Sequence, residues 1–155
     1  MPDDPKKHSP LDIPPLYFAL AIVSMFLLHR WLPIIDLIGP PWSWFGWVLI
    51  AGGVGLAIWA ERLFSRAGTG IRPFTPSTSL VAAGPYRFSR NPMYLGMMLV
   101  LVGGFLLAGS LGSLLPIPIF FWWIHTRFVL PEEDHMAAHF GNAYGAFKGG
   151  TRRWL

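Results

Sequence analysis

Residues 84–96, GPYRFSRNPMYLG, lie where a polar loop meets a long apolar segment. Asn91 is a favoured N-cap residue, because its side-chain oxygen can accept hydrogen bonds from the first free backbone N–H groups of a helix. Pro92 suits the first helical position, where a missing N–H is no loss. We therefore expect a helix to begin at Pro92, with its positive dipole end facing Arg87 and Arg90. This arrangement predicts an anion-binding site, although the two arginines could also serve only as anchors at lipid headgroups.

The composition favours a membrane as the solvent of this chain. Its 155 residues are 53% hydrophobic and 13% charged, whereas soluble domains carry about a quarter charged residues. The length suits a single domain, residues 1–155. Because the chain has no cysteine, disulfides, thiolate metal sites and a cysteine nucleophile are excluded. Its basic residues cluster at the ends of apolar segments, which is typical of membrane topology signals, so we expect no nucleic-acid partner.

Four apolar runs predict an all-α, polytopic membrane protein with about four transmembrane helices. A flexible tail, 1–15, precedes two spans within 16–64. A polar loop, 65–91, then leads to a helical hairpin over 92–130, whose spans 92–110 and 111–130 meet at a tight turn. Spans of this length match a bilayer core about 30 Å thick. The second run also has Gly53 and Ala57 at a spacing that lets helices approach closely in lipid.

The topology follows from the arginines. Loop 65–91 carries four arginines and no acidic residue, so we expect it on the cytoplasmic face, together with both termini. Pro131 should break or re-aim the last span. Residues 131–155 should then form an interfacial amphipathic helix, in which Met136, Phe140 and Tyr144 recur every four residues. Both polar segments would therefore meet on one membrane face.

Two motifs in this order resemble the signature of the integral-membrane methyltransferases, the superfamily of isoprenylcysteine carboxyl methyltransferase and the phospholipid methyltransferases. Residues 84–96 are similar to its Gly-Pro-Tyr-Arg-x-x-Arg-His-Pro-x-Tyr-x-Gly motif, with Asn91 in place of His. Residues 132–147 resemble its Glu-Glu-x-x-Leu-x-x-x-Phe-Gly-x-x-Tyr-x-x-Tyr element. The ending 151–155 resembles its Val-Pro-Arg-Trp. The resemblance covers roughly residues 65–155, and the first two apolar runs resemble the family only in kind.

The resemblance implies methyl transfer from S-adenosyl-L-methionine to a lipophilic or membrane-bound acceptor, at a site on the cytoplasmic face. An isoprenylcysteine-like carboxylate is the favoured acceptor, and a phospholipid amine or a thiol remains open. The expected cofactor contacts come from both motifs and comprise Tyr86, Asn91, Pro92, Met93, Tyr94, Gly96, Glu132, Glu133, Phe140 and Tyr144.

Catalysis would rest mostly on positioning and on the exclusion of water. We expect Arg90 first, and Arg87 second, to orient an anionic acceptor. Glu133 is the nearest base for an amine acceptor. Arg153 and Trp154 would either close the pocket around the substrate or anchor the chain at lipid headgroups. Asn91 cannot titrate near neutral pH, which excludes the histidine-based proton transfer that the family residue could perform.

Two other functional classes stay open. A small membrane transporter fits the size, but no acidic residue lies in the middle of a span, where transport paths usually carry charge. A non-catalytic membrane scaffold would fit the replacement of histidine by Asn91. His135 and His139 have the spacing of two ligands on one helix face, yet such a pair at an interface is more often solvated, so we expect no metal. The sequence leaves the oligomeric state open.

Overall fold

A computed structural model describes residues 13–66 and 81–155, and within these ranges every regular element is a helix. The rods are α1 (Pro14–Trp31), α2 (Phe45–Arg66), α3 (Pro92–Ala108) and a continuous run, Leu111–Phe140. That run consists of α4 (Leu111–Leu114), α5 (Pro116–Ile124), η3 (His125–Val129) and α6 (Leu130–Phe140). The shorter elements are η1 (Trp42–Trp44), η2 (Gly84–Arg87) and α7 (Asn142–Gly150).

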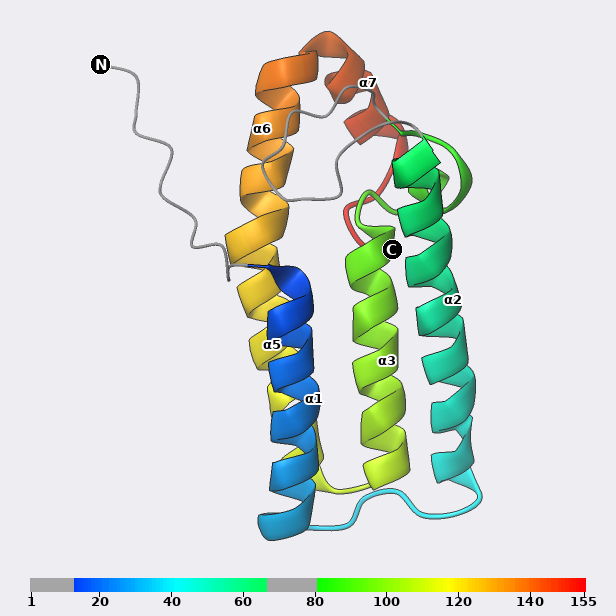
Figure 1. The fold of residues 1–155 in the computed structure, drawn as a ribbon, viewed down its shortest axis with the longest axis vertical. Helices are drawn as coiled ribbons and strands as arrows, with labels where there is room; N and C mark the ends of the chain where they lie inside the picture. The colour runs from blue at the N-terminus through cyan, green and yellow to red at the C-terminus, as the bar shows by residue number, and fades with distance from the viewer. Residues whose placement is uncertain (1–12, 67–80) are drawn as a thin grey trace, which may run out of the picture.

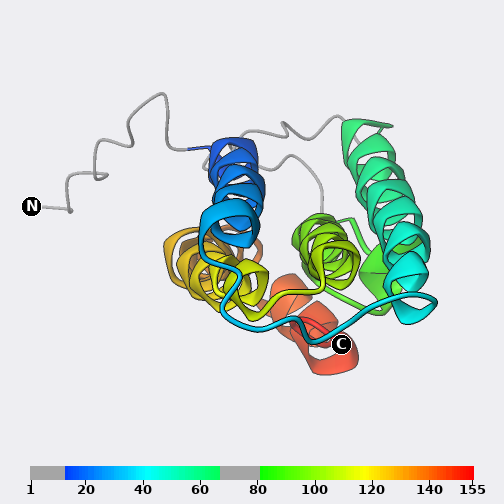
Figure 2. The same ribbon diagram turned by 90° about the horizontal axis from the view of Figure 1, so that it is seen from below.

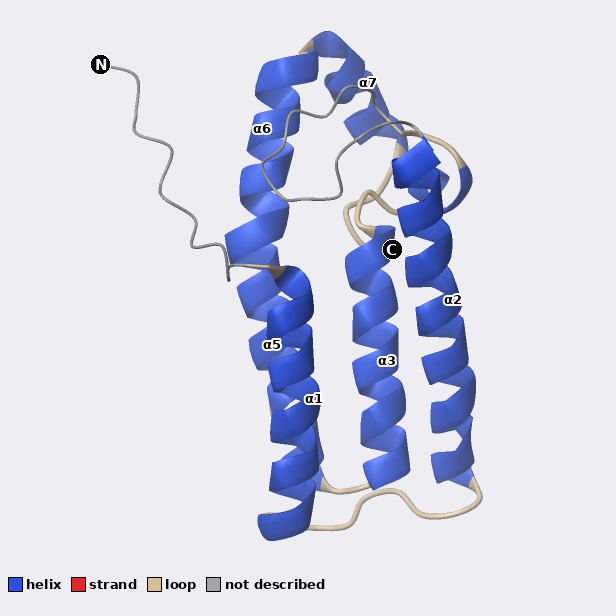
Figure 3. Ribbon diagram, in the orientation of Figure 1, coloured by secondary structure: helices blue, strands red, loops and turns tan. Residues whose placement is uncertain are grey.

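The rods run alternately up and down (Figures 1 and 3). Seen along the rods, α1 lies beside the run 111–140, and α2 lies beside α3 (Figure 2). The predicted all-α class is confirmed for the described residues. The segments 1–12 and 67–80, which hold most of the expected tail and part of the expected polar loop, lie outside them.

Two of the described helical rods, Trp42–Arg66 and Leu111–Phe140, are long and apolar enough to cross a membrane. Pro92–Ala108 is apolar but shorter. The outward faces of the rods carry large apolar side chains, and Phe26, Val48 and Ile119 are each 65% exposed. Apolar surface of this extent indicates a membrane environment rather than water. The count of four spans stays a prediction.

The packing of α2 on α3 depends on glycine pairs. A Cβ on Gly53 would lie 2.5 Å from the Gly96 carbonyl oxygen, and one on Gly46 would lie 2.4 Å from that of Gly103. A Cβ on Gly96 would also meet Ala57. The two backbones therefore touch, as the spacing of Gly53 and Ala57 predicts. This contact holds the start of α3 against α2 and so fixes the position of the 84–96 motif.

The end of the bundle that holds the 109–110 turn is closed by hydrogen bonds. Gly109, with φ +70°, ends α3 in the left-handed conformation that glycine tolerates. Its carbonyl oxygen accepts from the N–H groups of Leu37 and Ile38. His29 Nδ1 lies 2.9 Å from the Ser110 hydroxyl oxygen, and the Ser113 hydroxyl donates to the Ser110 carbonyl. The predicted tight turn is thus bound to the connection between α1 and α2.

The predicted break at Pro131 does not occur. The helix widens at η3, a π turn of five residues in which the Leu130 N–H donates to the His125 carbonyl oxygen, five residues back. Pro131 follows directly after this π turn, at the start of α6. A π turn provides this local change of hydrogen bonding without ending the helix. As a result α6 continues the rod beyond the other helices (Figure 1).

Candidate functional site

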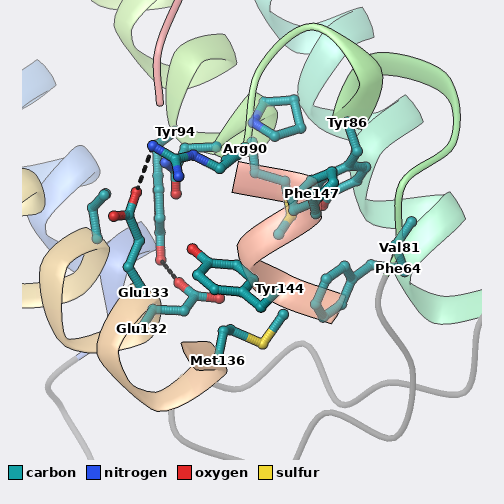
Figure 4. A pocket seen from close by; sticks show the side chains of 14 residues that line it. Phe64, Val81, Tyr86, Arg90, Tyr94, Glu132, Glu133, Met136, Tyr144 and Phe147 are labelled. Carbon is teal, nitrogen blue, oxygen red and sulfur yellow. Dashed lines mark hydrogen bonds and ion pairs between the residues drawn. The ribbon is translucent and has the colours of Figure 1, made fainter. Parts of the chain in front are cut away.

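A cavity lies at the opposite end of the bundle from the 109–110 turn. Side chains from α2, the 81–91 segment, α3, α6 and α7 surround it (Figure 4). Its volume is about 50 Å³. The lining residues are Phe64, Val81, Tyr86, Arg90, Asn91, Pro92, Met93, Tyr94, Val129, Glu132, Glu133, Met136, Tyr144 and Phe147. The two sequence motifs, far apart along the chain, therefore form one site.

Glu133 is the centre of the charge network. It is 7% exposed and receives two hydrogen bonds from Arg153, Nε to Oε1 and Nη2 to Oε2, both at 2.9 Å. Arg90 Nη2 lies 3.4 Å from Oε1 of the same carboxylate. Two guanidiniums thus share one buried carboxylate, and Glu133 fixes the direction of both.

Arg90 keeps free hydrogen-bonding capacity inside the protein. Its Nε and Nη1 are buried and have no partner, and neither has the hydroxyl of Tyr86. Both residues line the cavity. A buried donor left without a partner costs about 1–3 kcal/mol. These unpaired donors, on a side chain that carries positive charge, are what a carboxylate ligand would satisfy.

A second carboxylate, that of Glu132, comes from the same turn of α6 and also lines the cavity. The Tyr94 hydroxyl on α3 donates to Glu132 Oε2 at 3.4 Å, which joins α3 to α6 (Figure 4). No cation contacts Glu132 among the hydrogen bonds and ion pairs of the described residues. The cavity therefore offers cationic donors at Arg90 and carboxyl oxygens that can accept hydrogen bonds at Glu132.

Asn91 acts differently from the expectation. It occupies the N-cap position of α3 and Pro92 begins the helix, as predicted, but the Asn91 side chain makes no capping bond. Instead Asn91 Nδ2 donates to the Arg153 carbonyl oxygen at 3.0 Å. The Arg90 N–H also donates to the Arg152 carbonyl at 2.9 Å. Asn91 thus serves as a tether for the C-terminal segment, which a local capping argument could not reveal.

Burial or neighbouring groups raise the pKa values of Tyr86, Tyr144 and Arg153. Burial raises the pKa of the Tyr86 phenol above its ordinary value, and the charge of Glu132 adds to the rise. Burial, followed by the charge of Glu133, likewise raises the pKa of Tyr144. The hydrogen bonds to Glu133 raise the pKa of the Arg153 guanidinium. Both phenols therefore stay neutral, and can donate hydrogen bonds, throughout the physiological range.

Five of the expected site residues, Arg153 among them, lie outside the cavity lining. Gly96 packs against Gly53 of α2 and serves helix packing. Arg87 is exposed. Phe140 contacts His139, with ring centroids 4.8 Å apart. Trp154 packs against Phe121 of α5, with ring centroids 5.0 Å apart.

Arg153 also lies outside the lining, but it reaches the site through Glu133. His135 and His139 stack on each other on α6. Within residues 13–66 and 81–155, no group of three or more histidine or acidic side chains is placed to hold a metal ion.

The sequence analysis missed several apolar lining residues, namely Phe64, Val81, Val129, Met136 and Phe147 as cofactor contacts. Met136 belongs to the helical stripe noted in the sequence and Phe147 ends the 132–147 motif, so these signals could have placed both. Phe64 and Val81 come from the ends of α2 and of the polar loop. Only the tertiary packing of those ends brings them to the motif.

The sequence of this chain was compared with known families and proteins. The model of the family described as "Phospholipid methyltransferase" matches residues 42–143. The chain belongs to the phospholipid methyltransferase family. This match runs from the start of the second span to α7 and contains every lining residue of the cavity except Tyr144 and Phe147. A comparison with curated protein sequences gives no match.

Among solved structures, the fold is similar to that of the eukaryotic intramembrane Ras methyltransferase ICMT, isoprenylcysteine carboxyl methyltransferase. The TM-score is 0.68 at 19% sequence identity, over 96% of this chain and 53% of the other. This chain therefore has the fold of an integral-membrane methyltransferase. It spans about half the length of the ICMT chain.

Proposed function

We propose that this protein transfers the methyl group of S-adenosyl-L-methionine to a lipophilic or membrane-bound acceptor. The observation that carries the proposal is the pair of unpartnered Arg90 nitrogens, buried in a cavity built from both sequence motifs. Family membership sets the reaction class, and the arrangement of charges suits the cofactor. Four spans, with the cavity on the cytoplasmic face, remain our expected topology.

The residues present fit the polar groups of the cofactor. Arg90 and Tyr86 together offer three unpartnered polar atoms to its carboxylate. Glu132 can accept from its ammonium or ribose hydroxyls. Tyr144, with Met136 and Phe147 as neighbours in the lining, provides an aromatic and apolar wall for the adenine and the sulfonium. When bound, the cofactor supplies an electrophilic methyl group.

The cavity must open to admit a ligand of this size. Its volume of about 50 Å³ is well below the roughly 300–1,000 Å³ of ordinary ligand pockets. Tyr144 and Phe147 belong to α7, which joins α6 at Gly141. We propose that α7 moves outward as the cofactor enters and afterwards excludes water from the reacting groups.

The site favours an acceptor that needs no base. Glu133, the base expected for an amine acceptor, already accepts hydrogen bonds from Arg153 and lies against Arg90. A carboxylate acceptor attacks without losing a proton, so isoprenylcysteine-like O-methylation remains the favoured reaction. An amine or thiol acceptor would need Glu132 as the base. The role of Arg90 is then to hold the cofactor rather than to orient the acceptor.

Transfer of labelled methyl groups tests this function. Purified protein in lipid nanodiscs would receive tritium-labelled S-adenosyl-L-methionine with either N-acetyl-S-farnesylcysteine or phosphatidylethanolamine. We expect label in the methyl ester of N-acetyl-S-farnesylcysteine, loss of transfer in Arg90→Ala, and near-normal transfer in Arg87→Ala, because Arg87 is exposed and outside the lining. Equal transfer by the two variants would contradict the assignment of Arg90.

Two non-methyltransferase functions, a small transporter and a scaffold, predict different results. A scaffold that keeps only the fold would bind no cofactor. A transporter would show flux across vesicles that does not depend on Arg90.

A further inference from the structure

A second pair of unsatisfied polar atoms lies outside the cavity. His125 Nδ1 and Trp154 Nε1 are both buried and have no hydrogen-bond partner in the described structure. Their rings lie 6.1 Å apart between centroids. Phe121 stacks on His125 at 5.9 Å with an interplanar angle of 5°, and it also contacts Trp154. These three side chains form what we call the aromatic triad.

The backbone around the triad is unusual. His125 begins the π turn η3, and its carbonyl oxygen accepts the i−5 hydrogen bond that defines the turn. Such turns are rare and occur frequently at functional sites. The turn orients a histidine whose ring is packed but whose Nδ1 has no hydrogen-bond partner in the described structure. Packing alone does not require an imidazole with a free nitrogen at this position.

The triad adjoins the proposed cofactor site on its apolar side. Trp154 follows Arg153, which is hydrogen-bonded to Glu133. Val129, at the other end of the π turn from His125, lines the cavity. Trp154 also packs against the apolar core of the spans, which includes Phe128. The triad therefore lies about one helical turn from the cavity lining, next to the apolar core.

We propose that His125 and Trp154 bind the oxyanion of the methyl acceptor, a carboxylate or phosphodiester at the polar end of an amphiphile. The inference rests on the function proposed above. An indole N–H can only donate, so its partner must offer an accepting oxygen. A neutral imidazole protonated at Nδ1 donates in the same way, while Phe121 covers the apolar side. The pair thereby recognises oxygen rather than an ammonium group.

Binding measurements on isosteric variants test the inference. His125→Phe and Trp154→Phe each remove the polar atom and keep an aromatic ring, and Trp122→Phe is the control, because Trp122 is 62% exposed on the same rod. The probes are N-acetyl-S-farnesylcysteine, its methyl ester, and phosphatidylglycerol, each titrated in nanodiscs of phosphatidylcholine. One charge-assisted hydrogen bond corresponds to roughly ten- to a hundredfold in affinity.

We expect the free carboxylate to bind at least tenfold more weakly to both variants, with S-adenosylhomocysteine binding unchanged. The same loss confined to phosphatidylglycerol would assign the oxyanion to a phosphodiester. Equal affinity of wild type and both variants for every probe would overturn the inference. If wild type binds no S-adenosylhomocysteine but the triad still recognises an oxyanion, the proposed function fails while the oxyanion site remains.

The indole resonance of Trp154 provides a check independent of folding losses. In nitrogen-15 spectra it is assigned by its absence in Trp154→Phe. We expect it to shift when the wild type binds the carboxylate probe and not when it binds the ester. An unmoved resonance at saturating probe would contradict a hydrogen bond from this indole.

Discussion

The two ends of the helical bundle differ in how completely their buried polar groups are hydrogen-bonded. At the turn end, His29, Gly109 and Ser110 exchange hydrogen bonds with the connections around them. At the cavity end, Arg90 and Tyr86 leave three buried polar atoms unpaired. In the described structure every buried side-chain polar atom without a partner belongs to the cavity or to the adjoining aromatic triad. The polar groups of the first end are paired within the protein, and we propose that ligands pair those of the second.

The largest effect at the cavity end is expected for Glu133→Gln. The substitution leaves Arg90, whose side chain is 9% exposed, without its carboxylate. Removal of one partner from a buried ion pair costs about 3–5 kcal/mol. We expect stability to fall by about that range and methyl transfer to fall below detection. Chemical denaturation in detergent and the labelled-methyl assay measure the two effects.

The control for this change is Glu61→Gln on α2. Glu61 only accepts an exposed hydrogen bond from Ser65, so its replacement should change stability by about 0.5 kcal/mol or less. An equally large loss in both variants would show that the Glu133 effect has no connection with the ion pair.

A smaller effect on stability is expected from a change in the contact between α2 and α3. In Gly53→Ala the new Cβ would lie 2.5 Å from the Gly96 backbone oxygen, so α2 and α3 must move apart. Such overpacking costs typically about 1–3 kcal/mol. Gly52→Ala is the matched control, because nothing lies within 4 Å of its Cβ position. Thermal unfolding of the two variants should separate them, and equal melting temperatures would contradict the close approach of the helices.

Ser110→Ala should affect the turn end alone. It removes the hydroxyl partner of His29, at a cost of about 0.5–1.5 kcal/mol. We expect lower thermal stability with unchanged affinity for S-adenosylhomocysteine. A drop in that affinity would contradict the proposal that the turn end takes no part in cofactor binding.

The smallest effect is expected for Tyr86→Phe, which removes one donor from the cavity. The loss of one hydrogen bond should weaken S-adenosylhomocysteine binding by up to roughly tenfold. Because burial and Glu132 raise the pKa of Tyr86, the phenol stays protonated as the pH rises. The ratio of wild-type to variant affinity should therefore be the same near pH 7 and near pH 9, below the ordinary phenol value of about 10. A ratio that falls over this interval would mean that Tyr86 ionises there.

The sequence predicts the framework because the framework depends on local signals. Apolar runs and the Asn91-Pro92 pair predict the helices and the start of α3, and the glycine turn is found where expected. Pro131 is the instructive failure, because the π turn before it depends on packing that no local pattern reveals.

The candidate site also combines residues that the sequence predicts with contacts that it does not. The motifs contain Arg90, Tyr94, Glu132 and Glu133, which meet in the cavity. The bond between Asn91 and Arg153 and the contact of Trp154 with His125 join segments more than twenty residues apart. Such pairings depend on tertiary structure, so a single sequence does not contain their signal. Gly96 contacts α2 and is not in the cavity lining, and the sequence could not separate the two roles, because close approach of a ligand and close approach of a helix both require glycine.

The central claim is that the cavity end binds S-adenosyl-L-methionine through the free donors of Arg90. Isothermal titration calorimetry of S-adenosylhomocysteine into the purified protein tests it most directly, with Arg90→Ala beside Arg87→Ala. We predict micromolar binding by the wild type and by Arg87→Ala, and binding at least tenfold weaker by Arg90→Ala. No binding by a folded wild-type protein, or equal affinities in all three proteins, would contradict the claim.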